Sequence, residues 1–169
     1  MSVVTAYAEL QTTSNFSFLR GAAHPEELAA QAAALGLAAI AITDRNTLAG
    51  VVRGHLAAKE AGVKLIVGAR LDFTDAPSLL CLPTDRAAYG RLSKLITLGR
   101  RRAPKGECHL TLADFFAHCD GQIALALPPD DGVSDDDAFV RHLRILGAAL
   151  PGSCYLAESN PLAGGDHPG

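Results

Sequence analysis

The 169-residue chain is expected to adopt an α/β fold, because short apolar runs alternate along it with segments that have helical signals. One run, Leu37 to Ile42, is apolar throughout, as expected for a strand with both faces covered. The resulting β-α-β-α order predicts a parallel sheet with right-handed crossovers. A chain of this length can form one domain with its own hydrophobic core.

The first half of the chain contains boundaries for two helices that alternate with strands. A strand is predicted over residues 7–10. The first helix begins at Pro25, since proline suits a first helical position, and it ends before Gly36. The second helix is predicted over residues 47–60. Its inward apolar stripe is expected to comprise Leu48, Val51, Val52, His55 and Leu56.

The second half continues this alternation. Residues 64–71 and 78–82 are typical of two strands joined by a polar turn, which would form a hairpin. Asp85 is expected to cap the next helix, and Thr111 with Asp114 three residues later is typical of a capping box. The remaining predicted elements are a strand over residues 122–127, a helix over 135–150 and a short strand over 154–157.

Composition restricts the class of protein. The formal net charge of -3 gives no overall attraction to nucleic acid. No apolar run approaches the roughly 20 residues that would cross a bilayer, and no segment has the pattern of a signal peptide. We therefore expect a soluble, cytoplasmic protein with no membrane partner.

The four cysteines lack the C-x-x-C spacing of zinc ribbons and redox pairs. Free thiols are the default in a reducing compartment. One alternative stays open, because Cys108-His109 and His118-Cys119 would hold a structural zinc ion if the segment between them turned back.

Polar residues follow two predicted strands at the carboxyl ends, where α/β folds build their sites. The first strand continues into residues 11–15, and the strand ending at Ile42 continues into Thr43 and Asp44. We expect these two clusters side by side at one rim. A separate basic run follows a predicted helix, and either phosphate contact or a solvated helix end would explain it. It includes Arg100, Arg101, Arg102 and Lys105.

Four ordered blocks of sequence indicate a family. They are ELxxxSNFSFLxGAxHPEEL from Glu9, AIAITDRNTLAGVVRGHLAAKEAG from Ala39, KLIVGA from Lys64 and YGRLSKLITLGRRRAPKGE from Tyr89. The chain resembles the PHP (polymerase and histidinol phosphatase) domain at the amino terminus of bacterial C-family DNA polymerases, most closely their error-prone branch. The resemblance covers residues 7–127.

The resemblance implies a metal site from which most ligands are missing. The family's metal-binding form has His-x-His at the end of the first strand, where this chain has Gln11 and Thr13. Among the positions compared, Asp44 alone keeps a ligand-type side chain. Arginine stands at three further positions where the family has ligands: Arg20, Arg45 and Arg70.

We interpret this pattern as a non-catalytic PHP domain that binds no cofactor, because the arginines add positive charge where a metal ion would lie. Two other readings of the arginines stay open. They would form an anion or nucleic-acid pocket, or they would pair with Asp44 and Asp72. The alternative function is an active metal-dependent phosphoesterase or exonuclease whose site departs from the family pattern.

The resemblance also implies that the full-length protein is a DNA-directed DNA polymerase, a nucleotidyltransferase for damage-tolerant synthesis in DNA repair and replication. The polymerase domains and DNA would then be the partners of this chain, which by itself would be inactive. We expect the chain to be truncated before those domains.

The family fold is a distorted seven-stranded β/α barrel, and this chain supplies about six candidate strands, so we expect an incomplete, open PHP-type barrel. A partial domain is expected over residues 1–157, followed by an irregular tail over 158–169. An open sheet edge would also favour self-association of the isolated chain.

Overall fold

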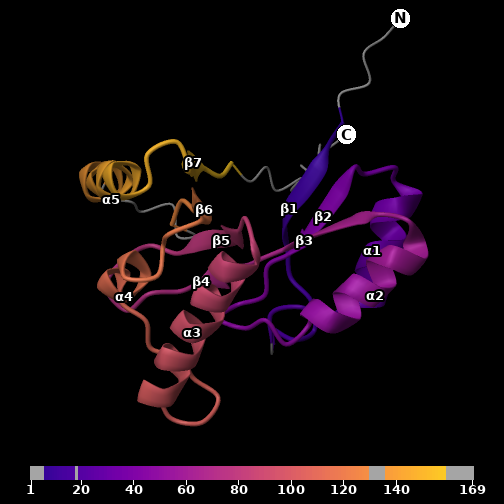
Figure 1. Ribbon diagram of the computed structural model, residues 1–169, viewed down its shortest axis with the longest axis horizontal. Coiled ribbons are helices and arrows are strands. Elements are labelled where there is room, and N and C mark those ends of the chain that lie inside the picture. Colours follow the sequence, from indigo (N-terminus) through magenta and orange to yellow (C-terminus); the bar gives the residue numbers. More distant parts are fainter. Residues whose placement is uncertain (1–5, 18, 130–135, 159–169) are drawn as a thin grey trace, which may run out of the picture.

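The computed structural model describes residues 6–17, 19–129 and 136–158, which form two β-sheets with helices on their outer faces (Figure 1). Sheet A contains β1 (Ala8–Thr12), β2 (Ala39–Ile42) and β3 (Lys64–Val67). Sheet B contains β4 (Ala69–Leu71), β5 (Leu79–Pro83), β6 (Gln122–Ala126) and β7 (Cys154–Leu156). The helices are α1 (Pro25–Ala34), α2 (Val51–Ala61), α3 (Arg86–Arg102), α4 (Leu112–Phe116) and α5 (Asp136–Ala149).

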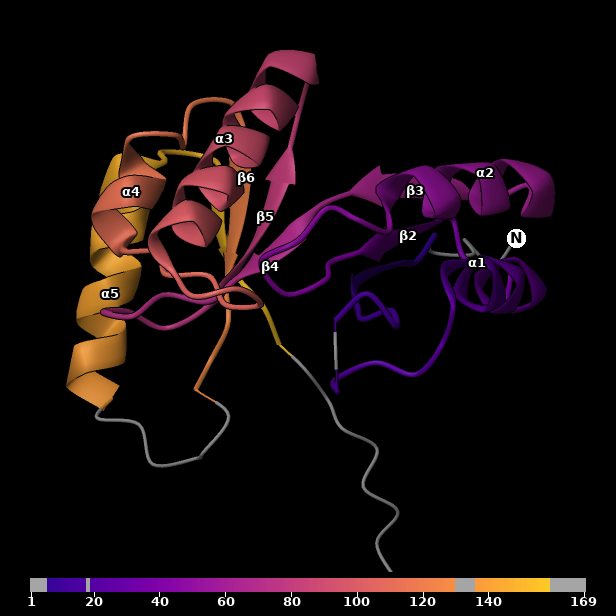
Figure 2. The same ribbon diagram turned by 90° about the horizontal axis from the view of Figure 1, so that it is seen from below.

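Sheet A is parallel throughout, and the paired helices α1 and α2 cover it (Figure 2). Small side chains make this layer, because Ala29 of α1 and Ala57 of α2 are both buried. Gly54 allows α2 to lie directly on β2, since a Cβ there would come within 2.8 Å of Ile42 Cδ1. Alanine and glycine therefore bring both helices close to the sheet.

The predicted inward stripe of α2 is wrong at three of its five members, whereas Leu48 packs against the main core and Val51 is half-buried. Val52 and Leu56 are 70% and 61% exposed, and His55 is exposed as well. The face that carries Gly54 and Ala57 is buried instead. The close approach of α2 to β2 leaves no room for large side chains, so the helix turns its smallest residues inward.

The chain crosses from sheet A to sheet B at Gly68. A Cβ at this position would lie 2.4 Å from Leu82 Cδ2 and 3.0 Å from the Cys81 carbonyl oxygen, so the crossing requires glycine. The single strand predicted over residues 64–71 is therefore wrong, because β3 belongs to sheet A and β4 to sheet B. Only β4 forms the predicted hairpin with β5; β6 then pairs antiparallel with β5, and β7 pairs parallel with β6. The predicted parallel sheet is thus correct for sheet A and wrong for most of sheet B. The β4 to β5 connection is too short for a parallel crossover.

The main hydrophobic core lies between sheet B and the helices α3, α4 and α5. Its fully buried side chains include Leu71, Leu79, Leu92, Leu95 and Phe115. A smaller cluster lies between the sheets and joins them, because Ala41 of β2 packs there with Leu80 and Leu82 of β5.

The two sheets do not close into a barrel within the described residues, which confirms the expected open fold. Strands β1 and β7 are edge strands, and a cavity of about 660 Å³ is lined by both of them, with Leu10 on one side and Leu156 on the other. Of the predicted tail over residues 158–169, only Glu158 belongs to the described part of the chain. Among the described helices, none is long and apolar enough to cross a membrane.

Candidate functional site

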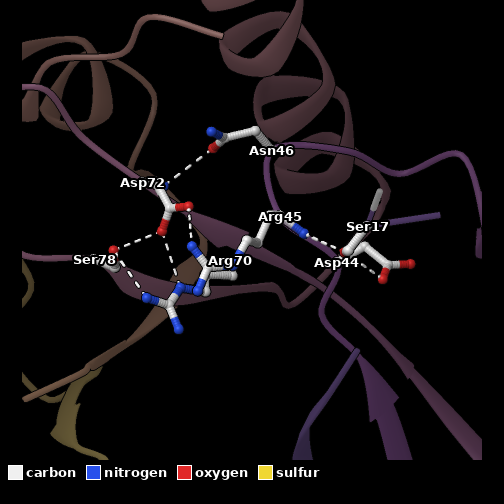
Figure 3. Close-up of polar contacts among 7 residues, drawn as sticks. All are labelled: Ser17, Asp44, Arg45, Asn46, Arg70, Asp72 and Ser78. Carbon is white, nitrogen blue, oxygen red and sulfur yellow. Dashed lines mark hydrogen bonds and ion pairs between the residues drawn. The ribbon is translucent and has the colours of Figure 1, made fainter. Parts of the chain in front are cut away.

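The rim at the ends of β1 and β2 is organised around the buried carboxylate of Asp44 (Figure 3). Asp44 Oδ1 accepts hydrogen bonds from the Ser14 backbone N–H at 2.8 Å and from the Ser17 hydroxyl at 2.7 Å. Asp44 Oδ2 accepts one from the Ser14 hydroxyl at 2.7 Å. These uncharged donors belong to the loop after β1, so Asp44 holds that loop against the end of β2.

A second carboxylate, Asp72, follows β4 and lies between two guanidinium groups (Figure 3). Arg45 Nη1 is 3.0 Å from Asp72 Oδ2, and Arg70 Nε is 2.9 Å from Asp72 Oδ1. The Ser78 hydroxyl donates to Oδ1 at 2.6 Å. Two cations therefore share one anion. Of the pairings proposed from the sequence, those of Arg45 and Arg70 with Asp72 are present, whereas among the described residues Asp44 pairs with no arginine and Arg20 pairs with neither carboxylate.

The local charges keep Asp72 ionised. Burial by itself raises the pKa of the Asp72 carboxyl. Hydrogen bonds from Ser78 and Arg70, together with the charges of Arg70 and Arg45, outweigh burial, so the pKa is lowered from that of an ordinary aspartate. Asp72 is therefore negatively charged at neutral pH and holds both arginines in place.

Backbone hydrogen bonds join the ends of β2 and β4 and so position these side chains. Arg45 and Arg70 form an isolated parallel bridge, in which Arg70 N–H donates to the Asp44 carbonyl at 3.0 Å. Asn46 N–H donates to the Arg70 carbonyl at 2.8 Å, and Asn46 Oδ1 accepts from the Asp72 N–H at 3.1 Å. Asn46 has a φ of 49°, in the left-handed region that asparagine tolerates better than most residues. The rim thus links sheet A to sheet B.

A cavity of about 650 Å³ lies beside this cluster. Three arginines from separate segments line it: Arg20 after β1, Arg45 after β2 and Arg100 in the last turn of α3. Arg100 Nε and Nη2 donate to the Asn46 carbonyl at 3.1 Å and 2.9 Å. The other charged or titratable groups in the lining are Asp72, Glu107, Cys108 and His109.

The remaining predicted site residues lie in different surroundings. Gln11 and Thr13 line the cavity beside β1 and β7, apart from the three rim arginines. Arg102 pairs at 2.6 Å with Asp114 at the start of α4. Arg101 and Lys105 are exposed. The basic run is therefore divided, and only Arg100 of its members lines the arginine cavity.

No role was predicted from the sequence for Ser14, Ser17 or Ser78. The first two were within reach of prediction, because hydroxyl side chains three residues apart follow a strand that ends beside Asp44. Ser78 was also within reach, because the predicted hairpin brings the start of its strand back beside Asp72. Glu107 had no such signal, since nothing in the sequence indicates that its loop returns to the rim.

The residues at this rim do not fit the divalent metal ion that the resemblance implies. Both Asp44 oxygens accept protein hydrogen bonds, and Asp72 is shared by two guanidinium groups. Within residues 6–17, 19–129 and 136–158, no three His, Cys, Asp or Glu side chains form a metal-binding group. Cys108, His109, His118 and Cys119 all belong to those residues, so the structure does not form the zinc site that the sequence left open.

The chain is similar in sequence to known proteins over most of its length. A family model described as PHP domain matches residues 9–144. An error-prone DNA polymerase from Caulobacter vibrioides is 56% identical over 161 residues, covering 95% of this chain and 15% of the relative. The error-prone DNA polymerase of Brucella abortus is 48% identical over 167 residues, with the same coverage of both chains. The chain thus spans 15% of the length of these curated relatives.

Two solved structures share the fold at low sequence identity. A candidate metal-dependent phosphoesterase from Bifidobacterium adolescentis matches with a TM-score of 0.66 and 16% identity, covering 90% of this chain and 77% of that one. An amidohydrolase from Chromobacterium violaceum matches with a TM-score of 0.62 and 17% identity, covering 89% and 76%. At such identities the likeness extends to the fold alone.

Proposed function

Since the chain belongs to the PHP-domain family and is similar to error-prone DNA polymerases, we propose that it is the non-catalytic PHP module of such a polymerase. In the full-length enzyme, the module would be a folded scaffold beside the polymerase domains and DNA during damage-tolerant synthesis. The isolated chain would not extend a primer, because 169 residues leave no room for a polymerase catalytic module. It would not hydrolyse phosphoesters, because the rim lacks the ligands of a metal site.

The arrangement around Asp72 is the observation that supports this proposal. Arg45 and Arg70 occupy positions where the resemblance predicts metal ligands, and both are ion-paired with Asp72. A metal ion bound there would face two fixed guanidinium charges. Each close pair of like unit charges costs about 4 kcal/mol at an effective dielectric constant of 20. This repulsion favours an inert rim over a metal-dependent one.

The alternative is an active metal-dependent phosphoesterase or exonuclease. Likeness of fold to a candidate phosphoesterase at 16% identity does not favour it, because one fold supports many unrelated activities. A metal-dependent reaction would need several carboxylate or imidazole ligands around the ion.

Metal content and hydrolysis distinguish the two functions. After purification without chelators, elemental analysis should find substoichiometric Zn, Mn and Fe. Hydrolysis of an aryl phosphate and of single-stranded DNA should stay at background after Mn²⁺ is added. Stoichiometric metal, or turnover with Mn²⁺, would establish the alternative.

Two sets of variants test whether the arginines are the cause. Gln11→His with Thr13→His should restore neither metal binding nor hydrolysis, because the arginines are still present. Adding Arg20→Asp, Arg45→His and Arg70→Glu to that pair should increase the amount of bound metal. Equal metal content in both sets would show that the arginines do not determine it.

We also propose that the isolated chain self-associates through the edge strands β1 and β7, which present unpaired backbone groups. Sedimentation velocity over a range of concentrations tests this. A monodisperse monomer at every concentration would contradict it.

A further inference from the structure

The cavity at the rim is lined by arginines that converge from three separate segments. Arg20 belongs to the loop after β1, Arg45 follows β2, and Arg100 lies at the end of α3. These residues are 25 and 55 positions apart in the sequence, so only the fold brings them together. The cavity, of about 650 Å³, is large enough for a group much bigger than a water molecule.

The positive charge in this cavity exceeds the negative charge that neutralises it. Asp72 is already shared by Arg45 and Arg70. Glu107 Oε2 is 3.1 Å from His109 Nε2, and both residues line the cavity. Neither Asp72 nor Glu107 forms an ion pair with Arg20 or Arg100, the other two arginines of the lining.

Of the three arginines that line the cavity, Arg20 and Arg100 have no carboxylate partner among the described residues. The Arg20 side chain has no hydrogen bond or ion pair with any described residue, although its backbone N–H donates to the Ser17 carbonyl. Arg100 donates to the neutral carbonyl of Asn46, which orients the guanidinium and leaves its charge uncompensated. Guanidinium groups that converge in this way match the oxygen atoms of a phosphate group.

We propose that this cavity binds a phosphate monoester dianion, either as free phosphate or as the terminal phosphate of a nucleotide or DNA strand. Arg20 and Arg100 supply the uncompensated charge, and Arg45, held by Asp72, supplies a third guanidinium at the cavity wall. The inference goes beyond the proposed scaffold role and does not depend on it. A non-catalytic module would keep its role if no phosphate were bound.

Isothermal titration calorimetry of the 169-residue chain with five probes tests the proposal. The probes are inorganic phosphate, deoxyadenosine 5′-monophosphate, deoxyadenosine, a short DNA strand with a 5′-phosphate, and the same strand without it. Inorganic phosphate and the monophosphate should bind, whereas deoxyadenosine should not. If the natural source is a nucleic acid end, the 5′-phosphorylated strand should bind more tightly than free phosphate and than the unphosphorylated strand.

Substitutions identify the site. Arg20→Gln and Arg100→Gln should each weaken phosphate binding by about tenfold or more, as expected for loss of one charge-assisted contact. Arg91→Gln is the matched control, because Arg91 also lies on α3 and its Nε also donates to a backbone carbonyl, that of Asp120, at 2.8 Å. It should bind phosphate as the unaltered chain does. Thermal unfolding of each variant shows whether it is folded, and Arg20→Gln should unfold at the unaltered temperature.

Several results would overturn the proposal: no binding of any phosphate probe by the folded chain, binding that neither Arg20→Gln nor Arg100→Gln weakens, or equal binding of deoxyadenosine. Release of phosphate from the monophosphate, measured in parallel, would count against the non-catalytic function and leave the binding site in place. Absence of both binding and hydrolysis would count against the phosphate site alone.

Discussion

Asp44 and Asp72 follow neighbouring strand ends at one rim, yet their surroundings differ in kind. Asp44 is 2% exposed and accepts three hydrogen bonds from uncharged serine groups. The Asp72 side chain is 30% exposed and is paired with Arg45 and Arg70. A buried carboxylate satisfied by neutral donors fixes the backbone around it, because each donor would otherwise be left without a partner. A half-buried carboxylate between guanidinium groups sets the local charge instead.

Ser17 connects the two clusters. Its hydroxyl donates to Asp44 Oδ1 at 2.7 Å and accepts from the Arg45 backbone N–H at 2.9 Å (Figure 3). The position of Arg45 beside Asp72 therefore depends on the network around Asp44. Stability should be more sensitive to Asp44, and the charge of the rim more sensitive to Asp72.

The largest effect is expected for Asp44→Ala, which leaves the buried Ser14 N–H and two hydroxyl groups without their acceptor. Urea denaturation should show a loss of about 3 kcal/mol or more in the free energy of unfolding. Asp85→Ala is the control, because exposed Asp85 accepts one hydrogen bond, from the Ala88 N–H, as the N-cap of α3. It should cost about 1 kcal/mol. Equal losses in the two variants would show that the network around Asp44 is not a special source of stability.

A smaller loss, about 2 kcal/mol, is expected for Asp72→Asn, because Arg45 and Arg70 would lose their shared anion and repel each other. The same change should tighten phosphate binding, since it removes a negative charge from the cavity lining. Urea denaturation and calorimetry measure the two effects. A variant that is destabilised and also binds phosphate more weakly would contradict the proposed role of Asp72 in the cavity.

The stabilisation by Asp72 should depend on pH. Its pKa is lowered in the folded chain, so its contribution is complete above the pKa of an unfolded aspartate, about 3.9, and is lost as the pH falls through the lower folded value. The difference in unfolding free energy between the unaltered chain and Asp72→Asn should be constant near neutral pH and shrink in acid. Glu26 and Asp114 also have lowered pKa values, but both chains contain them, so their contributions cancel. A difference that grew in acid would be inconsistent with the lowered pKa.

The smallest effect is expected for Ser78→Ala, which removes one hydroxyl donor from Asp72 Oδ1 and an acceptor of Arg70 Nη2, but leaves both ion pairs with Asp72. The free energy of unfolding should fall by about 1 kcal/mol. Thr97→Ala removes an exposed hydroxyl that donates to the Ser93 carbonyl, and it should change stability by about 0.5 kcal/mol or less. A loss in Ser78→Ala as large as that in Asp72→Asn would mean that the hydroxyl, rather than the ion pairs, stabilises this part of the rim.

Local signals in the sequence determined the ends of several elements, although α2 begins at Val51 rather than at residue 47. Pro25 and Gly36 bound α1, Asp85 caps α3, and the capping box of Thr111 and Asp114 begins α4, as predicted. Such signals depend on backbone geometry within a few residues, so they can be read without knowledge of the fold. The sequence blocks likewise identified the family, because their order and spacing match it even though single metal ligands are missing.

The tertiary structure alone decided which helix face is buried, how sheet B is paired and which arginines meet. Gly54 turned the small face of α2 inward against Ile42, although larger apolar residues formed the stripe in the sequence. Arg100 reaches Asn46, 54 residues away, and so joins Arg20 and Arg45 at one cavity. These outcomes depend on steric fit and charge between distant segments, and a sequence read position by position does not contain that information.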